Sequence, residues 1–280
     1  MIYYPDSLVD EWITDDVAQG DLTTRILGIG AREGRIILSL KKAGRASGID
    51  AAEKVLRKLG LAITERASDG TDLPDMGVLI SAEGKAPALF MSWKVAQNVL
   101  EWSCGVAEYT ARTVRAARSK NPNIQVSTTR KNIPGTKTLA LSAVLNGGGI
   151  IHRGSASETI LLFANHRAFL DFDNSAEAWK RAVDKLRAEA PEKKIIVEAE
   201  TMDEVRAALP SRPDIIQLDQ FSPAGVREAV ALAEGRCLIS AAGGVTADNA
   251  ADYAEAGAGL LVTSAPYYAK PSDVKVALGE

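Results

Sequence analysis

Residues 195–219, with the sequence IIVEAETMDEVRAALPSRPDIIQLD, carry the strongest indication of the fold. Two short apolar runs, at 195–197 and 215–218, flank residues 202–209, which have the composition of a helix. Strands that are apolar along nearly their whole length are buried on both faces, as in parallel sheets covered by helices. The stretch therefore predicts a strand, a helix and a second, parallel strand.

The same alternation continues towards the C-terminus. A helix at 223–234 is followed by a strand at 237–240, a helix at 247–256 and a strand at 260–263. Short connections and a repeat of about 22 residues are typical of the βα units of an α/β barrel, more than of a doubly wound sheet. The sequence therefore predicts an α/β barrel of parallel strands, similar to a TIM barrel.

The N-terminal half has a different organisation. Strands are predicted at 35–41 and 78–84, because these runs are apolar and end at turn-forming residues. A helix is predicted at 48–59, and a long amphipathic helix at 93–117. Because strands and helices do not alternate regularly here, this half is interpreted as an α+β region distinct from the barrel.

Two domains are expected in this chain. A length of 280 residues with 46% hydrophobic content is enough for one or two globular domains with a sizeable core. Residues 1–105 are interpreted as the first domain and residues 106–265 as the barrel, with the long helix as the bridge between them. The C-terminal tail, residues 266–280, is expected to pack back on the first domain.

Composition also bears on compartment and partners. A net charge of −3 gives no overall attraction to nucleic acid or to an anionic membrane surface. Cys104 and Cys237 lie far apart without a CxxC motif, as in proteins of a reducing compartment. The first residues do not resemble a signal peptide, and no apolar run reaches the roughly 18 residues of a membrane span. We therefore expect a cytoplasmic protein that binds neither nucleic acid nor membranes.

Polar residues and a glycine recur where the predicted strands end. Glu198, Asp219, Gly243 and Ser264 each lie at or just after such an end. The carboxyl ends of the strands of a parallel barrel converge on one mouth, where active sites lie. Arg130 follows a strand-like run in the same manner. These residues, far apart in sequence, are therefore expected to face one another.

Two basic motifs add positive charge to that mouth. TRKNIPG, from residue 129, contains Arg130 and Lys131, and GGGIIHR, from residue 147, contains His152 and Arg153. Arginine offers a planar fork that matches carboxylate or phosphate oxygens, and lysine offers a point charge. With only 2 histidines in the chain, a multi-histidine metal site is excluded. On residue type alone, a pocket for a polyanionic small molecule and a solvated basic loop both remain open.

The carboxylates and glycines suggest which anion such a pocket would take. Glu198 and Asp219 could act as an acid–base pair or as ligands for Mg²⁺, which one or two carboxylates plus substrate phosphates typically hold. Gly243 and Gly244 would let a phosphate approach backbone amides, although a tight turn between strand and helix also needs glycine. No P-loop or Rossmann glycine motif is present. The combination predicts a phosphorylated, Mg²⁺-bound substrate and an acidic co-substrate.

With these motifs the chain resembles the quinolinate phosphoribosyltransferase (nicotinate-nucleotide pyrophosphorylase) family nearly end to end. The resemblance implies an N-terminal α/β sandwich, an open α/β barrel and a homodimer, or a higher oligomer, with a composite active site. It also implies Mg²⁺-dependent transfer of phosphoribose from phosphoribosyl pyrophosphate (PRPP), the chemistry of a pentosyltransferase within the glycosyltransferases. The stretches that carry the resemblance are residues 19–24, 47–49, 103–107, 129–135, 147–153, 165–166, 197–198, 218–219 and 243–244.

The resemblance also implies roles for residues at the mouth. Arg130, His152 and Arg153 would bind the acidic acceptor. Lys131 would act in catalysis between the acceptor and the phosphoribosyl group. The implied catalytic and metal-binding residues are Glu198 and Asp219, and the implied phosphate-binding positions are Ala242, Gly243, Gly244 and Ser264.

Departures from the family pattern concentrate around the acceptor and phosphate contacts. Phe163 stands where the family has a lysine, and Lys94 where it has an arginine that reaches the neighbouring subunit's site. Phenylalanine removes a cation, and lysine loses the bidentate recognition of a carboxylate. Ala242 and Ser264 replace a serine and a glycine of the family. The substitutions at positions 94 and 163 favour an acceptor with fewer carboxylates than quinolinate.

The pattern is most similar to the diverged ModD branch of the family, a pyrophosphorylase branch associated with molybdenum transport. We therefore expect a PRPP-dependent phosphoribosyltransferase with an acidic, non-quinolinate acceptor and a link to molybdenum transport or metabolism. Two alternatives stay open. One is an authentic quinolinate phosphoribosyltransferase of NAD biosynthesis, and the other is a non-catalytic protein that binds an anion or a phosphorylated metabolite on the same fold.

Overall fold

The computed structural model describes residues 2–279, and contacts within the chain divide it into two compact units. The first unit comprises the described residues up to Ala111, together with Asn132–Gly148 and the C-terminal segment from Pro266. The second unit comprises Arg112–Lys131 and Gly149–Ala265. The units therefore do not follow the order of the chain. Across the described residues, no helix is both long and apolar enough for a membrane span.

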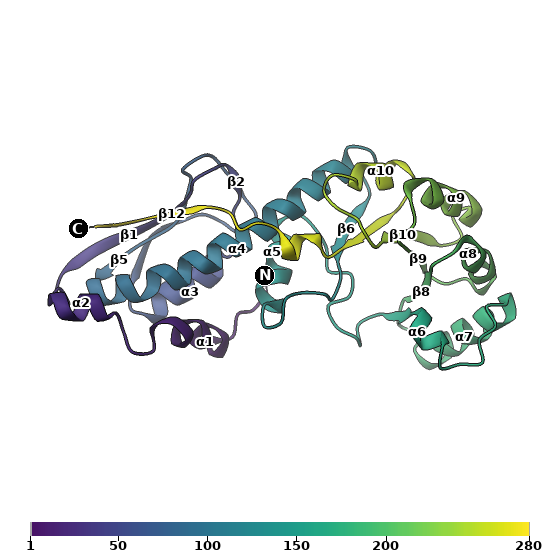
Figure 1. Cartoon of the computed structure of the whole chain (residues 1–280), viewed down its shortest axis with the longest axis horizontal. Helices are drawn as coiled ribbons and strands as arrows, with labels where there is room; N and C mark the ends of the chain where they lie inside the picture. Colours follow the sequence, from purple (N-terminus) through teal and green to yellow (C-terminus); the bar gives the residue numbers. More distant parts are fainter. Residues whose placement is uncertain (1, 280) are drawn as a thin grey trace. The chain divides into compact units, whose positions relative to one another are not determined.

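The first unit contains a four-stranded antiparallel sheet in the order β12-β1-β5-β3. Helix α3 (Ile49–Lys58) and the part of α4 (Ala86–Arg118) up to Ala111 belong to this unit and run beside the sheet in Figure 1. Ile36 of the sheet shares one buried core with Leu56 of α3 and Leu100 of α4. One sheet layer and one helical layer around this core form the expected α/β sandwich. Its strands are β1 (Glu33–Leu40), β3 (Ala62–Arg66), β5 (Val78–Lys85) and β12 (Val274–Gly279).

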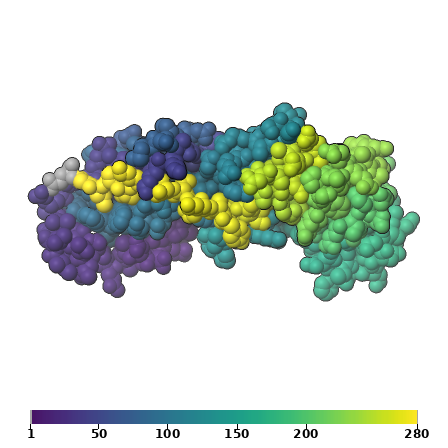
Figure 2. All heavy atoms as spheres, turned by 45° about the horizontal axis from the view of Figure 1, so that its top comes forward, coloured from purple at the N-terminus to yellow at the C-terminus, as the bar shows by residue number. Residues whose placement is uncertain are grey.

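Later parts of the chain also belong to the first unit. Helix α5 (Lys137–Asn146) packs on α4, because its Val144 is buried with Val106. Strand β12 pairs antiparallel with β1, and in Figure 2 this yellow C-terminal segment lies on the surface beside purple residues of the N-terminal part. The remaining short elements are α1 (Asp6–Val17), α2 (Leu22–Leu27), β2 (Gly44–Arg45), β4 (Asp72–Leu73) and η2 (Ala265–Tyr268).

The second unit is built on a six-stranded sheet in the order β6-β11-β10-β9-β8-β7. Every neighbouring pair in this sheet is parallel. Ile150 adds a parallel bridge to Ser127 of β6, beyond which the sheet has no further strand among the described residues. The two edges are not paired with each other, so the predicted α/β barrel is confirmed and is open. Its strands are β6 (Gln125–Thr128), β7 (Ile160–Leu162), β8 (Ile195–Ala199), β9 (Ile215–Asp219), β10 (Leu238–Ala242) and β11 (Leu260–Thr263).

Helices cover the outer face of this sheet. Figure 1 shows α7, α8, α9 and α10 along one side of the strands. Val197 of β8 and Leu218 of β9 belong to one buried core with Trp179 of α7 and Val226 of α9. The strands are apolar along nearly their whole length because they are packed against these helices. The helices of the unit are α6 (Ala164–Arg167), α7 (Ala176–Glu189), α8 (Met202–Ala208) with η1 (Leu209–Ser211), α9 (Pro223–Ala233) and α10 (Ala250–Glu255).

One predicted helix begins later than expected. The helix expected at 247–256 runs from Ala250 to Glu255. The preceding residues form a turn in which the Thr246 N–H donates to Asn249 Oδ1 at 2.8 Å, and Asn249 Nδ2 donates to the Gly244 carbonyl at 2.9 Å. Asparagine favours such local side-chain turns over helix, which explains the delay.

Candidate functional site

The carboxyl ends of the parallel strands carry the predicted carboxylates on one face. In the register of the sheet, Glu198 lies opposite Gln217, and Asp219 lies opposite Ala242. Gln217 and Asp219 are two residues apart on β9, so their side chains leave the same face of the strand. Leu218, between them, is buried on the helix-covered face. Glu198, Gln217 and Asp219 therefore share the inner face of the open barrel.

Glu198 is a half-buried carboxylate with one side-chain partner. Gln217 Nε2 donates to its Oε2 at 3.1 Å. Burial raises the pKa of Glu198, and the negative charge of Asp219 raises it further, against the opposing hydrogen bond from Gln217. The two carboxylates therefore repel each other across neighbouring strands, which is an arrangement that a bound cation would stabilise.

The carboxylate pair fits Mg²⁺ better than a metal held by protein ligands alone. Within residues 2–279 there is no group of three or more histidine, cysteine, aspartate or glutamate side chains placed to hold a metal ion. Mg²⁺ typically uses one or two carboxylates and takes its other ligands from water and substrate phosphates. Glu198 and Asp219 are thus the residues that could hold Mg²⁺ together with a phosphorylated substrate.

A corner formed by Gly243 and Gly244 follows β10. Gly243 and Gly244 have φ values of 78° and 79°, in the left-handed region that favours glycine. A Cβ atom at Gly243 would lie 2.8 Å from Asp219 Oδ1 and 2.9 Å from the Gln220 backbone nitrogen, whereas one at Gly244 would meet no atom within 4 Å. The backbone of the corner can therefore be approached closely at Gly244, while Gly243 is required by the packing of Asp219.

The end of β11 is hydrogen-bonded to the residue after this corner, and the segment after β6 is hydrogen-bonded to the end of β11. Thr263, the last residue of β11, donates through Oγ1 to the Val245 carbonyl at 2.6 Å, which places Ser264 immediately beyond this link. The Thr129 N–H donates to the Thr263 carbonyl at 3.0 Å. The ends of β6, β10 and β11 are therefore joined by hydrogen bonds, as expected for one mouth of a barrel.

The first basic motif begins directly after β6. Arg130 and Lys131 are both exposed, and the Lys131 N–H donates to Thr129 Oγ1 at 3.1 Å. The pKa of Arg153 is lowered by burial and also by the positive charge of Arg130. The structure therefore brings cations from the two basic motifs near each other. Like charges held together in this way favour an anionic ligand between them.

The second basic motif contains buried polar atoms without a protein partner. Nε2 of His152 and Nε of Arg153 are both buried and lack a hydrogen-bond partner. Burial, together with the charge of Arg153, lowers the pKa of His152, so its imidazole is neutral at pH 7. Such buried groups usually have a partner, and a ligand with acceptor oxygens would supply one to Arg153.

Phe163 is joined to this motif by its aromatic ring. The Arg153 guanidinium carbon lies 5.6 Å from the centroid of the Phe163 ring. The same ring stacks on His166 at 5.6 Å between centroids, with 20° between the planes, and the Phe163 N–H donates to His166 Nδ1 at 3.1 Å. His166 was not among the predicted site residues. An aromatic pair thus occupies the position at which the family resemblance implies a lysine.

Lys94 is not part of the compact unit that contains the other eleven predicted site residues. It lies on α4 in the first unit, half-buried, with Nζ 2.8 Å from Gln97 Oε1 and 4.1 Å from the centroid of the Trp93 ring. The remaining predicted residues all belong to the second unit. The contacts described above therefore do not connect Lys94 with the other predicted site residues.

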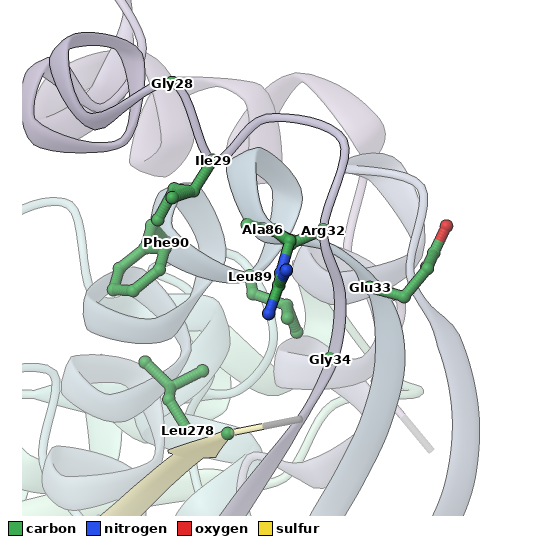
Figure 3. A pocket seen from close by; sticks show the side chains of 10 residues that line it. Gly28, Ile29, Arg32, Glu33, Gly34, Ala86, Leu89, Phe90 and Leu278 are labelled. Atoms are coloured by element: carbon green, nitrogen blue, oxygen red, sulfur yellow. The ribbon is translucent and has the colours of Figure 1, made fainter.

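A pocket in the first unit contains none of the predicted site residues. It has a volume of about 480 Å³ and lies where the residues before β1 meet α4 and β12. Figure 3 shows Phe90, Leu89 and Leu278 around this space, while the Glu33 side chain points away from it. The pocket is mostly apolar and brings no carboxylate pair or basic motif together, so it does not compete with the mouth of the barrel as the candidate site.

The chain is similar to known proteins over nearly its whole length. Residues 106–277 match the family described as quinolinate phosphoribosyl transferase, C-terminal domain, and residues 21–104 match its N-terminal domain. The ModD protein of Escherichia coli O6:H1 (strain CFT073) is 46% identical over 281 residues, which cover 99% of this chain and 98% of that protein. A Methanocaldococcus jannaschii protein named nicotinate-nucleotide pyrophosphorylase (carboxylating) is 31% identical over 86% of this chain and 84% of its own length.

Solved structures show the same fold. The nicotinate-nucleotide pyrophosphorylase of Francisella tularensis superposes with a TM-score of 0.89 at 24% identity, over 99% of this chain and 98% of that chain. Both domain matches, the identity to ModD and this shared fold cover nearly the whole chain. The chain therefore belongs to the quinolinate phosphoribosyltransferase family, most similar to its ModD members, and is a phosphoribosyltransferase.

Proposed function

We propose that the protein transfers the phosphoribosyl group of PRPP, in a Mg²⁺-dependent reaction, to an acidic acceptor other than quinolinate. One observation carries this proposal above the others. The mutually repelling carboxylates Glu198 and Asp219 share the inner face of the barrel, and Asp219 packs against the Gly243 corner. Such an arrangement suits a ligand that combines a divalent cation with phosphate groups.

The residues of the mouth supply the chemistry that this transfer needs. As the bond from the ribose anomeric carbon to the pyrophosphate oxygen breaks, the sugar becomes cationic and the leaving group anionic. The carboxylates of Glu198 and Asp219 would stabilise the sugar side, and the exposed Lys131 ammonium the anionic side. When bound, Mg²⁺ supplies positive charge to the pyrophosphate. The backbone of Gly244, open to approach, would bind the 5′-phosphate.

The acceptor is proposed to carry fewer carboxylates than quinolinate. Arg153 and the neutral His152 would bind its acidic group, with Arg130 nearby. The Phe163–His166 stack adds an apolar surface instead of a further cation. The similarity to ModD proteins supports a role in molybdenum transport or metabolism for the same reaction.

The transferase proposal is tested by measuring pyrophosphate release from PRPP and Mg²⁺ during a screen of acidic metabolites, with calorimetric titration of PRPP as the binding assay. We expect Mg²⁺-dependent PRPP binding and release with at least one acceptor that is not quinolinate. No PRPP binding at millimolar concentration would contradict the transferase function. PRPP binding without release by any acidic acceptor would favour a non-catalytic binder, and quinolinate as the best acceptor would restore the authentic enzyme of NAD biosynthesis.

Acceptor choice should depend on Phe163. A Phe163→Lys variant places a cation beside Arg153 and should raise the rate of quinolinate-dependent pyrophosphate release, by roughly tenfold if one charge-assisted hydrogen bond is gained. Phe163→Met, which keeps an apolar side chain, is the matched control and should leave the quinolinate-dependent rate at the level of the parent protein. An equal response of both variants would show that the charge at this position does not select the acceptor.

A composite site in a homodimer is also proposed, on the basis that residues 21–104 match the family's N-terminal domain. Lys94 of one subunit would then contribute to the barrel mouth of its partner. Light scattering should give the mass of a dimer or a higher oligomer. Mixing Lys94→Ala and Glu198→Gln proteins should restore part of the activity that each variant lacks alone, because one mixed site keeps both side chains. A monomer that retains full PRPP turnover would contradict the composite site.

A further inference from the structure

Arg167, the last residue of α6, is a buried guanidinium close to the candidate site. The residue is only 6% exposed. Charged side chains are rarely buried to this degree unless their donors and charge are satisfied by partners. Arg167 has such partners in backbone, carboxylate and aromatic groups, and none of them was expected from the sequence.

The Arg167 guanidinium joins the end of β8 to α8. Arg167 Nη1 donates to the backbone carbonyl of Glu198 at 2.8 Å, and Nη2 donates to Glu204 Oε1 at 2.8 Å. The guanidinium carbon also lies 4.6 Å from the centroid of the buried Trp179 ring. The planar fork is therefore held in one orientation, with each terminal nitrogen directed at a different acceptor.

Glu204 extends this contact back to the strand end. While one oxygen of its carboxylate accepts from Arg167, the other accepts from the Glu200 N–H at 2.8 Å. The backbone is thus held at Glu198 by the guanidinium and at Glu200 by the carboxylate that pairs with it. Because the backbone at position 198 fixes where the Glu198 side chain begins, this pair controls the direction of the carboxylate.

Arg167 also anchors the segment that carries the aromatic pair of Phe163 and His166. The Arg167 N–H donates to the Phe163 carbonyl at 3.2 Å, and His166 directly precedes Arg167 in the short helix. A four-residue helix has little stability of its own, so its position depends on side-chain anchors. The contact that links α6 to the end of β8 is the hydrogen bond from Arg167 to the Glu198 carbonyl.

We propose that Arg167 is a positioning residue that locks the Glu198 strand end to the α6 segment bearing Phe163 and His166. This inference rests on the proposed function, because it assigns Glu198 to the PRPP side and Phe163 to the acceptor side of one reaction. Arg167 touches neither substrate. It keeps the two halves of the site in a fixed relation, which a reaction between two bound partners requires.

The test is the affinity for PRPP in the presence of Mg²⁺, measured by calorimetric titration for the parent protein and its variants. Arg167→Met should weaken PRPP binding by roughly 10–100-fold, the range typical when a group that orients a ligand-binding side chain is lost. Arg167→Lys should recover part of this loss, because an ammonium can reach one of the two acceptors but cannot bridge both. Full binding by Arg167→Met would overturn the inference.

Two further variants separate positioning from stability. Val183→Ala removes buried apolar volume from α7 and should lower the Tm while changing PRPP affinity by less than about twofold. The double variant Arg167→Met/Glu204→Met replaces the ion pair with apolar side chains, which often preserves stability. Its affinity for PRPP should nevertheless be as low as that of Arg167→Met. Normal PRPP affinity in a folded double variant, or an equal loss in Val183→Ala, would overturn the positioning role.

The inference and the proposed function fail in different ways. If the parent protein and Arg167→Met bind PRPP equally well, the positioning role is wrong and the transferase function stands. If the parent protein binds no PRPP with Mg²⁺, the proposed function is wrong, and the role of Arg167 falls with it.

Discussion

A Glu198→Gln variant is expected to be more heat-stable than the parent protein at pH 7 and to release pyrophosphate from PRPP roughly 10²–10³-fold more slowly. Burial and the negative charge of Asp219 disfavour ionisation of Glu198, as its raised pKa shows. Glutamine has nearly the same shape and can still accept the hydrogen bond from Gln217. It therefore removes a charge that costs stability but that the reaction needs.

The gain in stability should depend on pH in a defined direction. The pKa of Glu198 lies above its ordinary value of 4.5 in the folded protein, so the folded state holds this proton more tightly than the unfolded state. Its stabilising contribution is complete below the ordinary value and is lost as the pH rises through the folded-state value. The difference in Tm between Glu198→Gln and the parent protein should therefore be small near pH 4 and grow to a plateau towards pH 8, as measured by calorimetry.

Glu200→Gln is the matched control for this prediction. Glu200 is an exposed carboxylate two positions further along the same strand end. Replacing Glu200 should change the Tm at pH 7 only slightly. It should leave the rate of pyrophosphate release unchanged. A Glu198→Gln protein that is less stable than its parent at pH 7, or that keeps full release, would contradict the assignment of Glu198.

The polar strand ends were accessible from sequence because the strands are so uniformly apolar. In the structure β8 ends at Ala199, β9 at Asp219, β10 at Ala242 and β11 at Thr263, close to where each apolar run stops. A parallel sheet covered by helices requires such runs, and the first polar residue after each run falls at the mouth. The expected positions of the carboxylates and the glycine corner follow from this rule alone.

Arg167 could not be identified in the same way. A lone arginine between His166 and Ala168 has the sequence appearance of a solvated surface charge. Its burial depends on Glu204 and Trp179, which are distant in sequence and approach only in the folded chain. Gln217 did carry a local signal, because an amide within an apolar strand needs a partner, and here that partner is Glu198.

The first glycine of the motif at 147–153 is required for the packing of two helices. A Cβ atom at Gly147 would lie 2.5 Å from the Ala107 carbonyl oxygen and 2.6 Å from Thr110 Cβ, so this glycine allows the end of α5 to approach α4. From sequence alone, the motif at 147–153 is open to two interpretations, an anion pocket and a solvated basic loop, and neither gives its glycines a role in packing. The structure assigns at least its first glycine to helix packing, a role that depends on tertiary contacts and is invisible in a motif.

Gly243→Ala is expected to weaken Mg²⁺-dependent PRPP binding by roughly 10²-fold, because it displaces the carboxylate of Asp219. The added Cβ would lie 2.8 Å from Asp219 Oδ1, 2.7 Å from Gln220 Cγ and 2.9 Å from the Gln220 backbone nitrogen. Real Cβ contacts are not this short, so the neighbouring atoms must move. The Gln220 N–H is bonded to the Ala242 carbonyl at 2.9 Å, which leaves Asp219 as the group most free to yield.

Gly235→Ala separates this crowding from the strain of a left-handed alanine. Gly235 precedes β10 as Gly243 follows it, has a φ of 74° against 78°, and would place its Cβ where no atom lies within 4 Å. Both variants should therefore lose a similar 1–2 kcal/mol or so from backbone strain, seen as a lower Tm, and only Gly243→Ala should lose PRPP affinity. If both variants bind PRPP as the parent does, the Asp219 carboxylate does not need its observed position, and its role in holding Mg²⁺ with PRPP would be contradicted. If affinity falls in Gly243→Ala alone, the close packing of Gly243 on Asp219 is what keeps that carboxylate in place for PRPP.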